Sequence, residues 1–157
     1  MPESTVPFMR RRIPNIILSV VGSYATMFVF VFVTFTVAYF ILGADGAFRP
    51  DSWDVSGAWI VVTIVLGFVA AYLGGMVCIR IDTSGKAPLY LIGLVIVLGI
   101  VTIVFAGAPV EMGPRTSDVG NFAAMANAQQ PDWVLYVNPL VGVLGIAFGC
   151  RMIGRSK

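Results

Sequence analysis

The stretch GAWIVVTIVLGFVAAYLGGMVCI, residues 57–79, decides the class of this protein. It carries no charged side chain, and a helix that crosses a bilayer needs about 20 largely apolar residues. Three other stretches of the chain meet the same requirement. We therefore predict four membrane-spanning helices, at residues 16–42, 57–79, 88–106 and 133–153, joined on the outer side by loops 43–56 and 107–132.

The composition of the whole chain supports an integral membrane protein. Of the 157 residues, 58% are hydrophobic and only 11% are charged, whereas soluble globular proteins average about 25% charged residues. Lipid admits only helices and closed barrels as spanning structures, and four segments are too few to close a barrel. The predicted fold class is therefore all-α, an integral membrane four-helix transmembrane bundle formed by a single domain, residues 1–157.

The first predicted helix resembles a signal peptide at its start, because three arginines at positions 10–12 precede the apolar stretch. The apolar core of a signal peptide is about 7–15 residues long, and residues 16–42 far exceed it. We expect this helix to remain uncleaved.

The distribution of charge predicts the orientation. Lysine and arginine concentrate in cytoplasmic segments. One side of the predicted bundle holds two basic residues, Arg49 and Arg115, and six of the eight acidic residues. The other side holds the remaining eight basic residues, which are Arg10, Arg11, Arg12, Arg80, Lys86, Arg151, Arg155 and Lys157. We therefore expect a multi-pass protein of the plasma membrane (the bacterial inner membrane), with the N-terminus and C-terminus cytoplasmic.

The chain lacks the residues that several classes of function require. The chain has no histidine and only two cysteines, which removes the commonest metal ligands and the usual general base. No Asp, Glu, Lys, Arg or His falls in the core of a predicted span, where proton relays and ion-coupled transporters carry such residues. We expect no enzyme activity, no cofactor and no metal, and the small net charge of +2 indicates no nucleic-acid partner.

Small residues recur at helical spacing along the second and fourth helices. In lipid such residues let helix backbones approach closely, because the hydrophobic effect does not hold helices together there. The expected helix-packing residues are Gly67, Ala71, Gly74, Gly75, Gly142, Gly145 and Gly149. Packing within one chain is the favoured interpretation, and a dimerisation face or a glycine-lined permeation path is the alternative.

Cys78 and Cys150 lie at similar depth near the predicted cytoplasmic face, and Arg80 and Arg151 follow them. A positive neighbourhood favours a reactive thiolate, so a redox pair is one hypothesis. We favour cysteine as a small apolar packing residue, and a disulfide on this reducing side would be transient.

Two features of the outer half remain open to interpretation. Residues 117–129 predict a short helix with Val119, Phe122, Ala123 and Ala126 on one apolar face, either a docking helix or a spacer that rests on lipid or on the rim of the bundle. Asn138-Pro139 predicts a kink in the fourth helix, since proline removes a helix hydrogen bond.

The two predicted hairpins resemble each other faintly, as in a parallel duplication. The second helix ends with Gly74-Gly75, followed by Cys78 and Arg80. The fourth helix begins at Pro131-Asp132-Trp133, contains Pro139 and ends with Gly149-Cys150-Arg151. This pattern resembles small four-span bacterial integral membrane proteins of unknown function, of a duplicated-hairpin type. The resemblance covers under half of the chain and implies no activity.

The favoured function is a non-catalytic accessory or scaffold subunit that associates with itself or with a larger membrane protein complex in the lipid bilayer. The alternative from another class is a small oligomeric channel or uncoupled carrier for a neutral solute. A membrane thiol redox protein that uses Cys78 and Cys150 is a third hypothesis.

Overall fold

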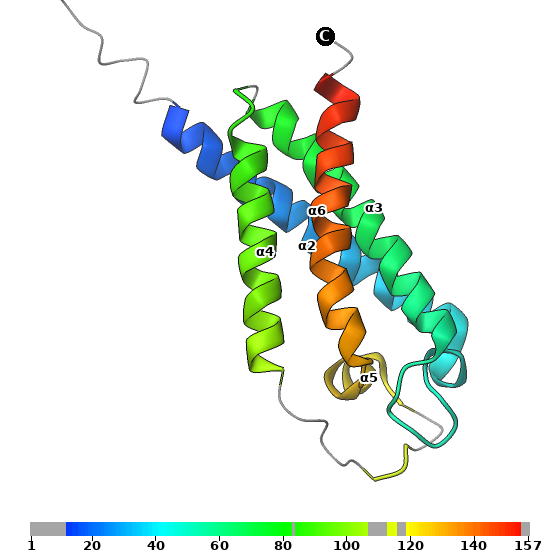
Figure 1. Cartoon of the computed structure of the whole chain (residues 1–157). Helices are drawn as coiled ribbons and strands as arrows, with labels where there is room; N and C mark the ends of the chain where they lie inside the picture. The colour runs from blue at the N-terminus through cyan, green and yellow to red at the C-terminus, as the bar shows by residue number, and fades with distance from the viewer. Residues whose placement is uncertain (1–11, 83, 107–112, 116–118, 155–157) are drawn as a thin grey trace, which may run out of the picture.

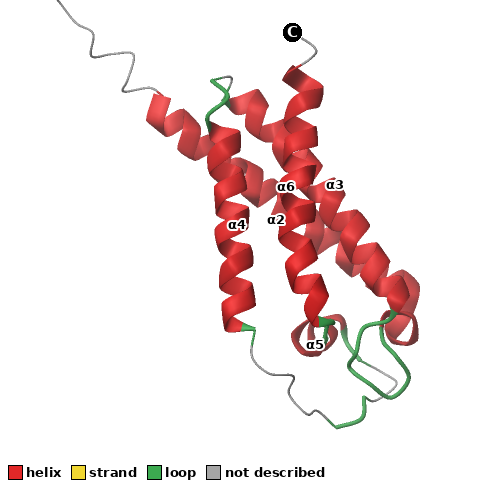
Figure 2. Cartoon of the chain, viewed as in Figure 1, coloured by secondary structure: helices red, strands yellow, loops and turns green. Residues whose placement is uncertain are grey.

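The structure is a computed structural model that describes residues 12–82, 84–106, 113–115 and 119–154 (Figure 1). Four of its helices are long and apolar enough to cross a membrane: α2 (Arg12–Ala47), α3 (Gly57–Ile81), α4 (Ala87–Phe105) and α6 (Asp132–Gly154). A short helix, α5 (Asn121–Asn127), lies in the second of the two loops predicted to be outer. The terms outer and inner denote the predicted sides of the membrane from here on. The regular structure in the described ranges is helical (Figure 2), which confirms the predicted all-α, four-helix transmembrane class.

Three of the four long helices lie close to their predicted bounds, and α2 differs most. It begins at Arg12 and runs to Ala47, but Gly43 interrupts it with φ of +65° and ψ of 177°. Glycine adopts positive φ at little cost. The continuous part of α2 therefore ends next to the predicted boundary at residue 42, and the remaining turn belongs to the outer loop.

The helix ends use local capping. The hydroxyl of Ser56 accepts a hydrogen bond from the backbone N–H of Trp59 at 3.1 Å, which caps the start of α3. Pro88 stands in the first turn of α4, where its missing N–H costs nothing.

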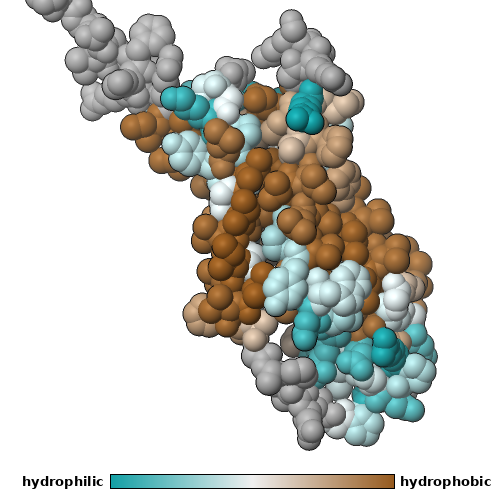
Figure 3. All heavy atoms as spheres, in the orientation of Figure 1, coloured by the Kyte–Doolittle hydropathy of each residue, from teal (hydrophilic) through white to brown (hydrophobic). Residues whose placement is uncertain are grey.

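The bundle is built around a central pair, α3 and α6. These helices share the most extensive contact in the molecule, α2 packs mainly on α3, and α4 packs mainly on α6. Both α3 and α6 run from the outer loops towards the same end of the bundle, where α2 begins (Figure 1). On the face shown in Figure 3, most side chains at mid-height are apolar, and the strongly hydrophilic ones gather towards the two ends.

The short outer helix differs from its prediction. It covers Asn121–Asn127 instead of residues 117–129, of which 117 and 118 lie outside the described residues. Phe122, Ala123 and Ala126 of the predicted apolar face are exposed, whereas Ala124 is buried. α5 contacts the bundle through the small side chain of Ala124, which permits close approach. The exposed Phe122, Ala123 and Ala126 are compatible with a docking helix and with a spacer that rests on lipid.

Candidate functional site

The tightest contact in the described structure joins α3 and α6, and glycines make it. A Cβ atom on Gly145 would lie 2.6 Å from the Cβ of Ala71 and 2.8 Å from the carbonyl oxygen of Phe68. A Cβ on Gly75 would overlap the backbone of Ile146. A Cβ on Gly149 would lie 3.0 Å from the backbone nitrogen of Met76. Since two parallel helices meet backbone to backbone here, no larger residue fits without moving one of them.

Two other glycines from the predicted set serve different neighbours. A Cβ on Gly74 would lie 2.5 Å from the Met27 side chain of α2, and one on Gly142 would lie 2.9 Å from the Val95 side chain of α4. These neighbours are side chains, which can shift, so the contacts are less strict than those between α3 and α6.

Gly67 is not a packing residue, contrary to the sequence-based prediction. Nothing lies within 4 Å of the position that its Cβ would take. It stands one turn outward from Ala71, beyond the tight contact with α6. A glycine that the prediction missed, Gly99 of α4, faces the ring of Pro139, whose Cβ lies 2.8 Å from the position of an added Cβ. The ring of Pro139 therefore occupies the space that Gly99 leaves on the surface of α4.

The two cysteines belong to one inner cluster, which also contains Ala71, Ala87, Leu91 and Ile146. Cys78 is fully buried and Cys150 is half-buried; both are free thiols. The Ser19 hydroxyl donates to the carbonyl oxygen of Cys78 at 2.7 Å, and the Cys150 thiol donates to the carbonyl oxygen of Gly75 at 3.4 Å. A reactive thiol needs access to solvent, which Cys78 lacks.

Two buried serines of α2 escaped the sequence analysis. Ser19 and Ser23 both have no exposed surface. Ser19 bonds to α3, whereas the hydroxyl of Ser23 has no hydrogen-bond partner in the described ranges. A serine in an apolar helix gives no pattern in the sequence that distinguishes a buried position from an exposed one.

The inner turn between α3 and α4 is organised by Asp82, which is buried. Its carboxylate accepts hydrogen bonds from the hydroxyl and the backbone N–H of Ser84, at 2.7 and 3.0 Å, and from the backbone N–H of Ala87 at 3.0 Å. Burial opposes ionisation, but hydrogen bonds from Ser84, Ala87 and Lys86 outweigh it and lower the pKa of Asp82 below its ordinary 3.8. The negative charge also lies at the positive start of α4.

The outer ends of α2 and α3 carry an aromatic cluster. The ring of Trp59 meets the rings of Phe35 and Tyr39 edge to face, with centroids 5.9 and 6.2 Å apart. The Tyr39 hydroxyl donates to the carbonyl oxygen of Val119 at 2.7 Å, and Ala124 packs against the same cluster. The second outer loop is thereby fixed to the first hairpin.

Backbone hydrogen bonds join the two outer loops. The N–H of Val55 donates to the carbonyl oxygen of Gln129 at 3.0 Å, and the N–H of Gln129 donates to the carbonyl oxygen of Trp53 at 2.9 Å. We call the joined loops, residues 48–56 and the described parts of 113–131, the outer cap.

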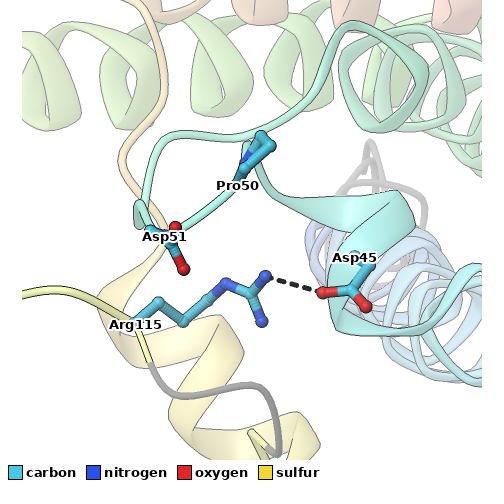
Figure 4. A pocket seen from close by; sticks show the side chains of 4 residues that line it. All are labelled: Asp45, Pro50, Asp51 and Arg115. Carbon is cyan, nitrogen blue, oxygen red and sulfur yellow. Dashed lines mark hydrogen bonds and ion pairs between the residues drawn. The ribbon is translucent and has the colours of Figure 1, made fainter.

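Arg115 is the charged centre of the outer cap (Figure 4). Its guanidinium lies 2.9 Å from the Asp45 carboxylate and 5.5 Å from the centroid of the Phe48 ring. The Arg115 side chain is 3% exposed, whereas that of Asp45 is 89% exposed. A pocket of about 200 Å³ lies beside them, lined by Asp45, Pro50, Asp51 and Arg115.

The chemistry of this pocket is limited. It offers two carboxylates and a guanidinium that already contacts one of them, and none of its lining residues is a nucleophile of the serine or cysteine type. Among the described residues, no three cysteine or carboxylate side chains form a group able to hold a metal ion. The sequence contained one signal for Arg115, since it is one of only two basic residues in the outer loops.

Comparisons with protein families, with curated proteins and with solved structures gave no match.

Proposed function

We infer that this membrane protein is a non-catalytic accessory or scaffold subunit, which associates with itself or with a larger membrane complex. The observation that carries this inference is the contact between α3 and α6. Gly75, Gly145 and Gly149 bring the two central helices together backbone to backbone, so the centre of the bundle at this level is occupied by the chain itself. A closely packed central pair is the framework that a scaffold needs.

The surface around this pair supports the same proposal. α4 presents large apolar side chains to its surroundings along most of its length, among them Val97, Val101, Val104 and Phe105. Such faces accept either lipid or another helix, since lipid tails are as apolar as these side chains. In the outer cap, Arg115 and the backbone groups of Val55 and Gln129 are engaged in holding the loops together.

The proposed location is a bacterial inner membrane, with both termini in the cytoplasm. The eight basic residues on that side support it. The short motifs shared with small four-span bacterial proteins of unknown function support the same assignment.

Isolation of the native protein in mild detergent tests the accessory function. We expect a defined assembly, either of several copies or with a second membrane protein in fixed stoichiometry. Recovery of a monomer alone, with a solute flux in liposomes of the pure protein, would contradict the proposal.

One observation favours a channel or uncoupled carrier for a neutral solute as the second candidate. The hydroxyl of Ser23 is buried and has no hydrogen-bond partner among the described residues, and a buried polar group normally has one. A passing solute with a hydroxyl or amide group would supply it. Liposome flux that Ser23→Ala abolishes, while Thr26→Ala leaves it unchanged, would favour this candidate.

The thiol redox hypothesis has the least support. Cys78 is inaccessible, so oxidation would require the inner cluster to open. The redox hypothesis would be supported if Cys78→Ala and Cys150→Ala variants lost a native phenotype while their thermal stability stayed unchanged.

A further inference from the structure

Asn138 lies at a depth where a membrane protein rarely leaves an amide uncovered. The apolar span of α6 runs from Asp132 to Ile153. At a rise of about 1.5 Å per residue, Asn138 falls about 7 Å from the middle of that span, well inside a hydrocarbon core of about 15 Å half-thickness. The neighbouring Pro139 packs on Gly99, which lies near the middle of α4, and this contact supports the assigned depth.

The amide of Asn138 is exposed and makes no hydrogen bond with any described residue. The threonines of the spans behave differently: Thr26, Thr34 and Thr102 each donate to a carbonyl oxygen one turn earlier in their own helix. Asparagine is too polar for lipid, and side chains of this kind normally hydrogen-bond across helices. The isolated chain therefore leaves a polar group at hydrocarbon depth without a partner.

The position of Asn138 around α6 shows where a partner fits. Residues 138, 142, 145 and 149 follow the spacing of one helix face, and the three glycines of that face are already covered by α3 and α4. The exposed apolar side chains at the same level lie on a different face, at Tyr136, Leu140 and Leu144. On α3, Gly67 is also open at this level. One turn further out on this side of α6, Val134 is fully buried, so the part of the packing surface that the chain leaves uncovered lies at the level of Asn138 and Gly67.

We propose that a second copy of this chain covers this surface, with Asn138 of each copy hydrogen-bonded to the other. An amide carries both donors and an acceptor, so two copies of one asparagine satisfy each other across a two-fold axis. Closed two-fold dimers are the commonest oligomers. Two copies inserted in the same orientation place residue 138 at the same depth, so an axis along the membrane normal brings the two amides together. This inference rests on the proposed self-association and names the residue that mediates it.

The test uses the full chain in liposomes, with donor- and acceptor-labelled copies mixed at increasing dilution in lipid. We expect energy transfer from the wild type and from Asn138→Gln, which keeps the amide. Asn138→Leu should raise the dimer dissociation constant roughly 3- to 30-fold, the range expected for a few interhelical hydrogen bonds in lipid. Thermal unfolding of Asn138→Leu should match the wild-type monomer, because the substitution removes no contact within the chain.

Cross-linking provides the geometric test. In a background with Cys78→Ala and Cys150→Ala, Asn138→Cys should form a covalent dimer on oxidation, whereas the matched control Leu140→Cys on the lipid-facing side should not. Unchanged energy transfer for Asn138→Leu, or a covalent dimer from Leu140→Cys alone, would overturn the proposal and leave self-association through another face. A monomer bound to a different membrane protein would overturn it and leave the accessory function standing. Solute flux through a monomer would contradict the proposed function itself.

Discussion

At the scale of single residues, the fold depends on which positions are occupied by glycine, whose side chain is a single hydrogen atom. Gly75 and Gly67 lie on the same face of α3, eight residues apart. A methyl group added to Gly75 would overlap the backbone of Ile146, whereas one added to Gly67 would meet nothing within 4 Å. Spacing alone therefore predicts that glycines face a neighbour but does not identify which of them do. The neighbour's backbone position makes the difference, and that position depends on tertiary structure.

Gly75→Ala should therefore lower the thermal stability of the protein in detergent. Overpacking at a strict contact costs about 1–3 kcal/mol. Gly67→Ala is the matched control, and it should leave stability unchanged or raise it by up to about 1 kcal/mol, because alanine is the better helix former. Equal melting temperatures for the two variants would show that α3 and α6 are not in close contact.

The buried carboxylate of Asp82 predicts a dependence of stability on pH. Its pKa in the folded chain lies below the ordinary 3.8, so the ionised form stabilises the fold at every pH above that value. The stabilisation is lost as the pH falls through the lowered pKa. Asp82→Asn should cost about 1–3 kcal/mol near neutral pH, the range for hydrogen bonds to a charged group.

Thermal unfolding from pH 7 to pH 3 measures this effect. The gap in stability between the wild type and Asp82→Asn should remain constant down to about pH 4 and shrink below it. A gap that widens as the pH falls from 7 to 5 would mean that the pKa of Asp82 is raised in the folded chain instead.

At the scale of structural elements, long apolar helices were predictable and the outer cap was not. Lipid requires every backbone group of a span to bond within its own helix, so hydropathy and length suffice to place α2, α3, α4 and α6. The cap depends on contacts between distant segments, such as Val55 with Gln129, and no local pattern encodes them. The contact of α5 with the bundle was not predicted for the same reason, since the short side chain of Ala124 packs in one cluster with Tyr39 and Trp59.

The cap itself predicts unequal effects for the two partners of its ion pair. Asp45 is almost fully exposed, and an exposed ion pair contributes at most about 1 kcal/mol. Arg115 is buried and also lies over the Phe48 ring, so its removal takes away packing and a cation–π contact as well. Arg115→Gln should therefore loosen the cap more than Asp45→Asn does.

Hydrogen exchange of the backbone amides in residues 48–56 measures this loosening. We expect faster exchange in Arg115→Gln, a small change in Asp45→Asn, and none in the exposed control Arg49→Gln. Equal acceleration by Asp45→Asn and Arg115→Gln would show that the ion pair alone holds the cap.

At the scale of the whole molecule, the bundle is asymmetric across the membrane. The inner half closes around the cluster of Cys78, Leu91 and Ile146, and the outer end is closed by the cap. Between them α4 leaves most of its surface to the surroundings. This arrangement fits a protein whose outward faces, and not an interior site, meet its partners.

The topology is the central claim, and accessibility of single cysteines to a membrane-impermeant thiol reagent tests it most directly. In a background with Cys78→Ala and Cys150→Ala, the account predicts labelling of Gln130→Cys in intact spheroplasts, whereas Ser84→Cys and Ser156→Cys should react only after the membrane is opened. Labelling of Ser84→Cys and Ser156→Cys with Gln130→Cys silent would invert the orientation, and labelling of only one of the two inner positions would contradict a bundle of four spans.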